Sequence, residues 1–365
     1  MNIKSNINKK TDFKVLVAPL DWGLGHATRC IPIIRSLINN GAEVLLAAEK
    51  ETKLLLSKEF PDLIILNIEG YRVKYQKSGS FAIKLFTQIP GIISSIKKEK
   101  NWLSEVIKKH KIDIVISDNR YGLNNKMVHC IFITHQLSIL TGNKLLDKIL
   151  QKINYRFISK FNECWIPDVK ENNNLSGLLS HPKKLPDTKI KYVGVLSRFI
   201  KLHSNIKNNF LFLISGPEPQ RTIFEEQLIK VSKNILGNKI FVRGVPNSDE
   251  LKINDETLFY NHLPAEKLNQ LISESEIIVC RSGYSTIMDL SATGKKAILI
   301  PTPGQKEQEY LAKYLGNKNG FIFLQSLDNI NGAIETIKGK DYPNEVSSFI
   351  EDAVVNLLRE QTILK

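Results

Sequence analysis

The chain lacks the patterns that mark secreted, zinc-binding or membrane-spanning proteins. It has four cysteines in 365 residues, and they form no C-x-x-C pair, so neither a disulfide framework nor a zinc site is expected. No apolar run approaches the roughly 18 residues of a transmembrane helix. Residues 1–10 are polar and lysine-rich, unlike a signal peptide. We therefore expect a cytoplasmic protein with reduced thiols.

Acidic residues are scarce relative to basic ones. The chain has 37 Asp and Glu against 51 Lys and Arg, which gives a net charge of +14. This charge suits an anionic partner such as nucleic acid, an acidic membrane surface or a phosphorylated substrate. Zinc-finger spacing, RNP-like aromatic motifs and arginine-rich tracts are missing, so nucleic acid is the least favoured. A non-enzymatic basic protein that binds nucleic acid or membrane remains one hypothesis.

Short apolar runs alternate with amphipathic segments along the whole chain. This is typical of α/β domains in which helices cover both faces of a parallel sheet. We expect two Rossmann-like domains, at residues 1–198 and 199–344, facing each other across a cleft. A C-terminal helix at 345–365 is expected to pack back toward the first domain. Strands are expected at residues 15–18, 44–48, 63–66, 112–117, 130–134, 210–215, 239–243, 257–260, 277–280 and 297–300.

The first expected strand leads into a turn that carries Gly23, Gly25 and His26. Ligands of open α/β sheets bind at the carboxyl ends of the strands. Glycines let the backbone approach a ligand closely, and histidine moves protons near neutral pH. Under the functional hypothesis, His26 is a general base and the glycines leave room for the reacting group. The alternative is a tight strand-to-helix turn whose histidine caps the helix.

A sharper motif, Cys280 to Leu290, follows a strand and opens a helix. Small residues and hydrogen-bond donors gather there, an arrangement suited to a diphosphate at a helix N-terminus. These residues are Arg281, Ser282, Gly283, Ser285 and Thr286. Asp289 lies one helical turn beyond Thr286 and can accept two hydrogen bonds from a ribose diol. The alternative is a plain helix start with Ser285 as N-cap and Asp289 in solvent.

Two further turns follow strands of the second half. Ser215-Gly216 can offer a hydroxyl and backbone amides to a phosphate, or it forms an ordinary turn. Gln305, Gln308 and Glu309 open a helix, where their side chains can bond sugar hydroxyls, although such residues are also common on exposed helices.

In the first half, two polar pairs follow strands. Asp118-Asn119 should face the same crevice as His26, where Asp118 orients His26 or binds acceptor hydroxyls. His135-Gln136 holds a similar position after the next strand. The alternative for both pairs is that they cap the segments that follow.

These motifs, in this order, resemble those of the GT-B glycosyltransferases. The chain is similar to the family that includes the undecaprenyl-linked GlcNAc transferase of peptidoglycan synthesis (family 28 type) and the galactolipid synthases. The resemblance implies that the C-terminal domain holds a UDP-sugar and the N-terminal domain an acceptor. It also implies roles for single residues: Ser215 near phosphate, the Leu263 main chain near uracil, Asp289 on ribose, and Gln308 and Glu309 on the donor sugar.

The segment Gly25 to Cys30 also resembles a turn in the UDP-sugar hydrolase of pseudaminic acid synthesis, which uses water in place of an acceptor alcohol. The expected function is therefore inverting transfer from a UDP-sugar to a hydroxyl acceptor, with UDP-sugar hydrolysis as the alternative. No two aspartates stand two residues apart, so the metal-binding DxD motif is missing and no metal or other cofactor is expected. The leaving charge would then fall to helix N-termini, backbone amides and Arg281.

A helical region at residues 81–111 combines many lysines with apolar residues, and we expect a break near Pro90-Gly91. A basic, apolar helix can lie on an anionic bilayer, which would place the protein at the inner face of the membrane beside a lipid-linked acceptor. The alternative is an ordinary amphipathic helix with a solvated lysine face.

Overall fold

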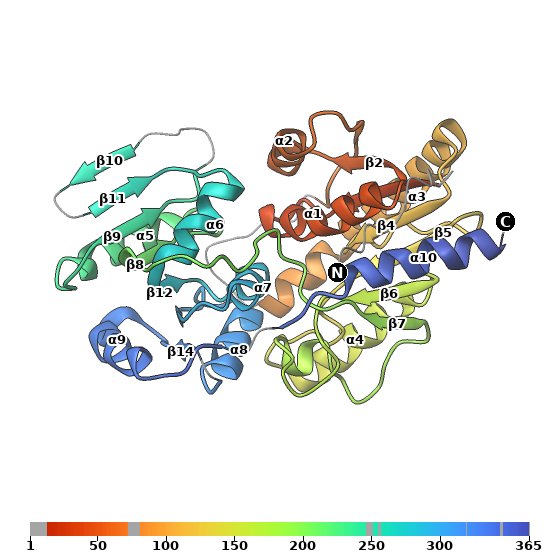
Figure 1. The fold of residues 1–365 in the computed structure, drawn as a ribbon. Coiled ribbons are helices and arrows are strands. Elements are labelled where there is room, and N and C mark those ends of the chain that lie inside the picture. Colours follow the sequence, from red (N-terminus) through yellow and green to blue (C-terminus); the bar gives the residue numbers. More distant parts are fainter. Residues whose placement is uncertain are drawn as a thin grey trace. The chain divides into compact units, whose positions relative to one another are not determined.

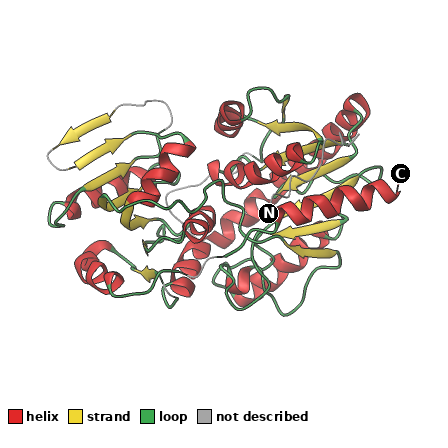
Figure 2. Cartoon of the chain, in the orientation of Figure 1, coloured by secondary structure: helices red, strands yellow, loops and turns green. Residues whose placement is uncertain are grey.

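The computed structural model describes residues 13–71, 81–245, 251–254, 257–318, 320–343 and 346–364. The chain forms two compact units (Figure 1). Unit 1 comprises Met1–Lys170, Leu178–Leu196 and Ser348–Lys365, and unit 2 comprises Glu171–Gly177 and Ser197–Ser347. In each unit, helices accompany a mainly parallel sheet (Figure 2), as expected for an α/β protein.

The described strands of unit 1 form one parallel, seven-stranded sheet in the order β3-β2-β1-β4-β5-β6-β7. Its central strands are apolar runs buried along almost their whole length, because helices cover both faces. The first five strands lie within three residues of the predicted positions, whereas the last two were not predicted. The strands are β1 (Lys14–Pro19), β2 (Glu43–Ala48), β3 (Ile65–Asn67), β4 (Ile114–Asp118), β5 (His129–Ile133), β6 (Glu163–Ile166) and β7 (Lys189–Tyr192).

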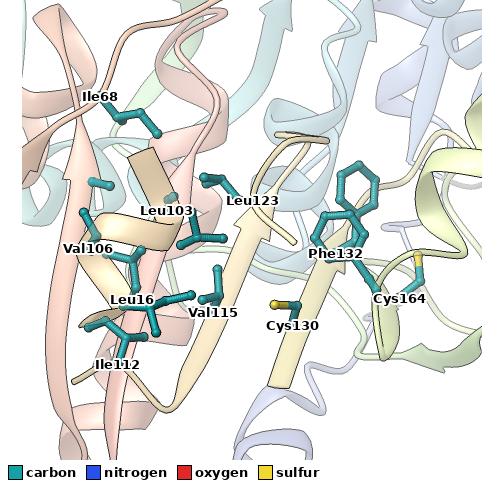
Figure 3. Packing of buried hydrophobic residues seen from close by; sticks show 14 of the residues in the cluster. Leu16, Ile68, Leu103, Val106, Ile112, Val115, Leu123, Cys130, Phe132 and Cys164 are labelled. Carbon is teal, nitrogen blue, oxygen red and sulfur yellow. The ribbon is translucent and has the colours of Figure 1, made fainter. Parts of the chain in front are cut away.

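The helices of unit 1 pack their apolar faces on this sheet. Figure 3 shows Leu103 and Val106 of α3 in the same cluster as Leu16 of β1 and Val115 of β4. The helices are α1 (Leu24–Asn39), α2 (Lys50–Glu59), α3 (Phe81–His110), α4 (Lys144–Ile158) and α10 (Ile350–Leu364). A short 3₁₀ turn spans Gly177–Leu179.

The expected break in the helix at Pro90-Gly91 is wrong. A single helix, α3, runs from Phe81 to His110. A proline inside a helix removes one backbone hydrogen bond and costs about 3 kcal/mol, and the packing of the later turns of α3 in the core offsets that cost. Leu103 and Val106 are buried there, as the ordinary amphipathic helix requires. The side chains of residues 81–90 lie outside the described part of the chain.

Helix α10 returns the chain to unit 1. The Phe349 amide donates to the Val193 carbonyl at 2.8 Å. Glu351 accepts hydrogen bonds from Ser36 of α1 at 2.6 Å and from Asn40, the C-cap residue of α1, at 2.7 Å. Apolar residues of α10 complete the contact: Val354, Leu357 and Leu358 are buried.

The described strands of unit 2 form a second sheet in the order β10-β11-β9-β8-β12-β13-β14, in which only the β10–β11 pair is antiparallel. Stacked phenylalanines on β8, β9 and β11 line one face. The strands are β8 (Asn208–Leu213), β9 (Lys239–Val242), β10 (Leu251–Asn254), β11 (Thr257–Tyr260), β12 (Ser275–Cys280), β13 (Ala297–Leu299) and β14 (Phe321–Phe323). The helices are α5 (Gln220–Ser232), α6 (Ala265–Glu274), α7 (Tyr284–Thr293), α8 (Lys306–Leu315) and α9 (Ile330–Lys338), with a 3₁₀ turn at Leu327–Asn329.

Both sheets reverse their strand order at one point. In unit 1 the chain moves outward from β1 through β2 and β3, then returns to β4 on the other side of β1. In unit 2 it does the same from β8, returning at β12. Ligands of open α/β sheets bind at such switch points, at the carboxyl ends of the strands. The carboxyl ends of β1 and β4, and of β8 and β12, are therefore where each unit should bind its ligand.

Candidate functional site

The unit 1 site begins with the turn between β1 and α1. Gly23 precedes the helix with φ 94° and ψ 165°, a conformation that is essentially restricted to glycine. Helix α1 already begins at Leu24, so Gly25 lies in its first turn, where its carbonyl accepts a hydrogen bond from Thr28. His26 therefore projects from a helix start at the switch point, beside the end of β4.

The structure brings His26 together with Asp118 and His135. The His26 Nδ1 atom lies 3.1 Å from Asp118 Oδ2. Arg29 lies one helical turn after His26 and contacts both histidines. The Arg29 Nε atom donates to Asp118 Oδ2 at 2.7 Å, and its Nη2 atom donates to Asp118 Oδ1. Arg29 also places Nη2 2.9 Å from His26 Nδ1 and Nη1 3.1 Å from His135 Nδ1. Asp118 is fully buried and Arg29 is only 2% exposed.

The charges in this cluster depend on each other. Burial by itself would raise the pKa of the Asp118 carboxyl, but Arg29 and His26 outweigh burial and lower that pKa to about 2. Burial lowers the pKa of His26, an effect that Asp118 opposes and Arg29 reinforces. At neutral pH the cluster thus holds an ionised Asp118 and a neutral His26, the form in which histidine accepts a proton.

The neighbouring polar residues of unit 1 support the loops at this sheet edge. Asn119 adopts φ 56° directly after β4, and its amide donates to the Ile133 carbonyl at 3.1 Å. The Gln136 carbonyl accepts a hydrogen bond from Asn154 of α4 at 2.9 Å.

Arg29 was not among the residues predicted from the sequence. The signal that could have identified it is its three-residue spacing from His26, which places both side chains on one helix face.

In unit 2, the predicted residues Arg281, Ser282 and Gly283 lie between β12 and α7. Arg281 is buried, with its guanidinium 3.8 Å from the Phe224 ring centroid and its Nη1 donating to the Pro301 carbonyl at 2.6 Å. Burial lowers the pKa of Arg281 to about 10. Ser282 is fully buried and donates to the Gln308 carbonyl at 2.8 Å. Gly283, not Ser285, is the N-cap residue of α7.

Helix α7 starts at Tyr284, directly after the N-cap residue Gly283. Ser285 and Thr286 are half-buried in the first turn. The alternative of an Asp289 in solvent does not hold, because Asp289 Oδ1 accepts a hydrogen bond from Ser197 at 2.5 Å. Burial raises the pKa of Asp289 to about 6, against the opposing effects of Ser197 and Arg198.

Gln305, Gln308 and Glu309 brace the turn before α8. Gln308 Oε1 accepts from the Thr302 amide at 2.9 Å and its Nε2 donates to Gln305 Oε1 at 2.7 Å. Glu309 accepts from the Gly304 amide at 3.0 Å. These side chains are therefore held in place at the carboxyl end of β13.

The other predicted residues of unit 2 lie at strand ends of the same sheet edge. Ser215 and Gly216 follow β8 and are exposed, and Gly216 adopts φ 118°. Leu263 follows β11 and its side chain is buried.

Within the described ranges, no three His, Cys, Asp or Glu side chains are grouped as metal ligands would be. None of the described helices combines the length and the hydropathy of a transmembrane span.

Comparison with known proteins identifies the second half of the chain most directly. Residues 240–338, from β9 to the end of α9, match the family model of the glycosyltransferase family 28 C-terminal domain. This segment contains α7 and the start of α8, which carry most of the predicted donor-side residues.

Curated relatives extend the similarity over most of the chain. The UDP-N-acetylglucosamine–N-acetylmuramyl-(pentapeptide) pyrophosphoryl-undecaprenol N-acetylglucosamine transferase of Haemophilus ducreyi is 22% identical over 324 residues, which is 83% of each chain. The Buchnera aphidicola enzyme of the same name is 23% identical over 345 residues, 92% of this chain and 85% of the relative.

Solved structures agree on the fold. MurG of Acinetobacter baumannii superposes with a TM-score of 0.56 at 14% identity, over 95% of this chain and 99% of that one. The glycosyltransferase of kitacinnamycin gives a TM-score of 0.61 at 12% identity, over 96% of this chain and 94% of that one. The chain is therefore a glycosyltransferase of the GT-B fold, similar to MurG, with a family 28 C-terminal domain in its second unit.

Proposed function

We propose that this glycosyltransferase transfers a sugar from a UDP-sugar to a hydroxyl group of a lipid-linked acceptor, with inversion and without a metal ion. The names of its relatives support this proposal, since they describe transfer from a UDP-sugar to a pyrophosphoryl-undecaprenol acceptor. The observation that carries it is the contact of His26 with the buried Asp118 at the switch point of unit 1.

The reaction follows from the unit 1 cluster. His26 Nε2 takes the proton of the acceptor hydroxyl while the acceptor oxygen forms a bond to the anomeric carbon. The bond from that carbon to the diphosphate oxygen breaks, and its electron pair leaves with UDP. Attack opposite the leaving group inverts the configuration. Asp118 stabilises the imidazolium that forms. A positioned general base, the role of His26, contributes about 10²–10⁴-fold.

Unit 2 would hold the nucleotide. The start of α7 would place its positive dipole end at the diphosphate, and Asp289 would exchange its bond to Ser197 for the ribose hydroxyls. Gln308 and Glu309, braced against the 302–304 turn, would contact the donor sugar. Charge on the leaving group would then be stabilised by amide donors at a helix start.

The test compares wild type with His26→Gln in an assay of UDP release, with and without a polyprenyl-diphosphate-sugar acceptor. We expect acceptor-dependent release that His26→Gln lowers 10²–10⁴-fold without weakening UDP binding, and a product of inverted configuration by NMR. Release that is equally fast without acceptor would favour the UDP-sugar hydrolase instead. Unchanged turnover in His26→Gln would remove His26 from the mechanism.

Contact with an anionic membrane is the remaining part of the proposal, and helix α4 supports it. Every exposed residue of α4 is either basic or aliphatic: Lys144, Leu145, Lys148, Ile149, Lys152, Ile153 and Arg156. Leu145, Ile149 and Ile153 are 73%, 53% and 43% exposed. Aliphatic side chains enter a bilayer surface while lysines bind anionic headgroups at about 1 kcal/mol each.

Vesicle sedimentation tests this surface. Wild type should bind vesicles containing phosphatidylglycerol, bind pure phosphatidylcholine vesicles weakly, and lose binding at high salt. The variant Lys148→Glu/Lys152→Glu should lose binding. The control variant Lys108→Glu/Lys109→Glu makes the same charge change at exposed sites on α3 and should retain most of the vesicle binding. Loss in the α3 pair but not the α4 pair would place the membrane surface on α3 instead.

A further inference from the structure

The turn between β1 and α1 exposes a large aromatic ring. Trp22 is 39% exposed, whereas the other two tryptophans, Trp102 and Trp165, are partly buried and fully buried. Trp22 stands directly before Gly23, where an added Cβ would meet no heavy atom within 4 Å in the described part of the chain. The indole ring therefore borders open space at the switch point of unit 1, shortly before His26.

Segment 69–71 holds this ring in place. Tyr71 meets Trp22 edge to face, with ring centroids 6.1 Å apart and the ring planes at 80°. Such a contact leaves at least one face of the indole uncovered by Tyr71. The Tyr71 hydroxyl donates to Glu99 of α3 at 2.9 Å and accepts from the Tyr121 amide at 2.7 Å. Because Tyr71 is also buried, its ring is a fixed support for the exposed indole.

A buried arginine joins the two parts of this support. Arg120 is fully buried; its Nη1 donates to the Pro19 carbonyl at the end of β1 at 3.4 Å, and its Nη2 donates to the Glu69 carbonyl at 2.5 Å. The Arg120 Nε atom donates to Glu99 Oε1 at 2.8 Å. Burying such an ion pair is costly, because both ions lose their water. The end of β1, which leads into the turn, and segment 69–71 are thus held by one buried cation.

An exposed but fixed indole is suited to a sugar ring. Many pyranoses have a face that carries only C–H groups, which packs on an aromatic face while the hydroxyls at the rim stay free to form hydrogen bonds. Tryptophan offers a large contact area at a low entropic cost, and a ring that is already fixed lowers the cost of binding further. A diphosphate has no such apolar face, and a flexible polyprenyl chain has no flat face to match the ring.

We propose that Trp22 is the platform on which the acceptor sugar stacks, and that this contact selects acceptors whose reacting hydroxyl is on a pyranose ring. Tyr71, Glu99 and Arg120 are positioning residues that hold the platform. The inference rests on the proposed function, in which His26 takes the proton of the acceptor hydroxyl, but the binding of a sugar at Trp22 can be tested without transfer.

The first experiment measures binding alone, through tryptophan fluorescence in the absence of a donor. Two probes are compared: farnesyl diphosphate that carries N-acetylglucosamine, and farnesyl diphosphate without a sugar. The sugar-bearing probe should change the emission of wild type in a saturable way, and Trp22→Phe should lose this change. An equal change with farnesyl diphosphate alone would assign Trp22 to the lipid and overturn the proposal, as would no change with either probe.

The second experiment separates acceptor binding from catalysis. Trp22→Ala should raise the KM for the acceptor about tenfold and leave kcat and the KM for the UDP-sugar nearly unchanged, because stacking stabilises the ground state and the transition state alike. Trp22→Phe keeps a ring and should retain most of the affinity. The control Phe349→Ala removes a ring of similar exposure, 42%, from the same unit and should change none of these constants. An unchanged acceptor KM in Trp22→Ala would overturn the proposal.

The role of Tyr71 has its own test. Tyr71→Ala should raise the acceptor KM, and it should add nothing to Trp22→Ala in the double variant, because both substitutions act through the same ring. Equal additional losses in the single and double variants would show that Tyr71 acts apart from the platform.

The two proposals fail in different ways. A chain that shows the Trp22-dependent fluorescence change but transfers no sugar would refute the proposed function and keep the platform. Sugar transfer with an unchanged acceptor KM in Trp22→Ala would do the reverse. If Trp22→Ala does not fold, Trp22→Leu takes its place, since leucine keeps apolar volume and lacks a flat ring.

Discussion

Replacing Asp118 by asparagine should destabilise unit 1 more than any ordinary hydrogen-bond loss. Asp118 is fully buried and neutralises Arg29, which is also buried. Removing one partner of a buried ion pair leaves an uncompensated charge and typically costs about 3–5 kcal/mol. The pKa of Asp118 gives an independent estimate: its fall from 3.8 to about 2 corresponds to about 2 kcal/mol of stability. We therefore expect Asp118→Asn to lose about 2–5 kcal/mol at pH 7.

The pH dependence of that loss has a defined sign. Because the folded-state pKa of Asp118 is lowered, its contribution is complete above pH 4 and disappears as the pH falls through about 2. The difference between wild type and Asp118→Asn should therefore shrink between pH 4 and pH 2. Urea unfolding midpoints, followed by circular dichroism across this range, measure it.

A matched control lies just before the other end of the same strand. Asp113 precedes β4, and its side chain accepts a hydrogen bond from the Lys14 amide at 2.8 Å. Asparagine keeps an acceptor oxygen, so Asp113→Asn should cost about 1 kcal/mol. Asp113→Asn should leave sugar transfer unchanged, whereas Asp118→Asn should lower it, since His26 loses the negative charge that stabilises its protonated ring. A stability loss in Asp118→Asn no larger than that in Asp113→Asn would refute the reasoning.

Three other outcomes are expected. Asp289→Asn should stabilise the protein at pH 8. The folded-state pKa of Asp289 is raised to about 6, so wild type loses about 3 kcal/mol of folding stability as the pH rises from 4 to 7. Melting curves at pH 5 and pH 8 check this, and an equal effect of the substitution at both pH values would contradict it. Gly23→Ala should cost about 1–3 kcal/mol through backbone strain alone, because a Cβ at this position has no neighbour within 4 Å; a neutral change in melting temperature would show that the turn relaxes. Adding EDTA should leave the initial rate of sugar transfer unchanged, and a loss restored by Mg²⁺ or Mn²⁺ would show that a metal ion takes part.

The sequence predicted the parts of the fold that depend on local patterns. Strands such as β1 and β4 are continuous apolar runs, and parallel strands covered on both faces need that pattern. The pattern fails for the last two strands of unit 1, β6 and β7. Strand β6 begins with Glu163, which is buried between lysines and His129, and β7 contains two lysines. No local rule predicts a strand from residues whose charges are paired only in the tertiary structure.

The candidate site shows the same division. His26 and Asp118 were recognised because each follows a strand at the expected edge of the sheet. Arg29 was not, since two of its three partners, Asp118 and His135, are distant in sequence. Asp289 was expected in solvent or on a ribose, and its bond to Ser197 could not be foreseen because Ser197 carries no motif.

The return of α10 to unit 1 has a consequence for how the protein is made. Unit 2 consists of residues 197–347 and the short segment 171–177, all of which precede α10 in the chain. Unit 1, in contrast, needs residues 348–364 to cover α1. Domains fold as units while the ribosome delivers the chain from its N-terminus. Unit 2 can therefore finish folding while the apolar surface of α1 still awaits Val354, Leu357 and Leu358. Until α10 has left the ribosome, that surface is uncovered, so unit 1 is completed only after unit 2 has been synthesised.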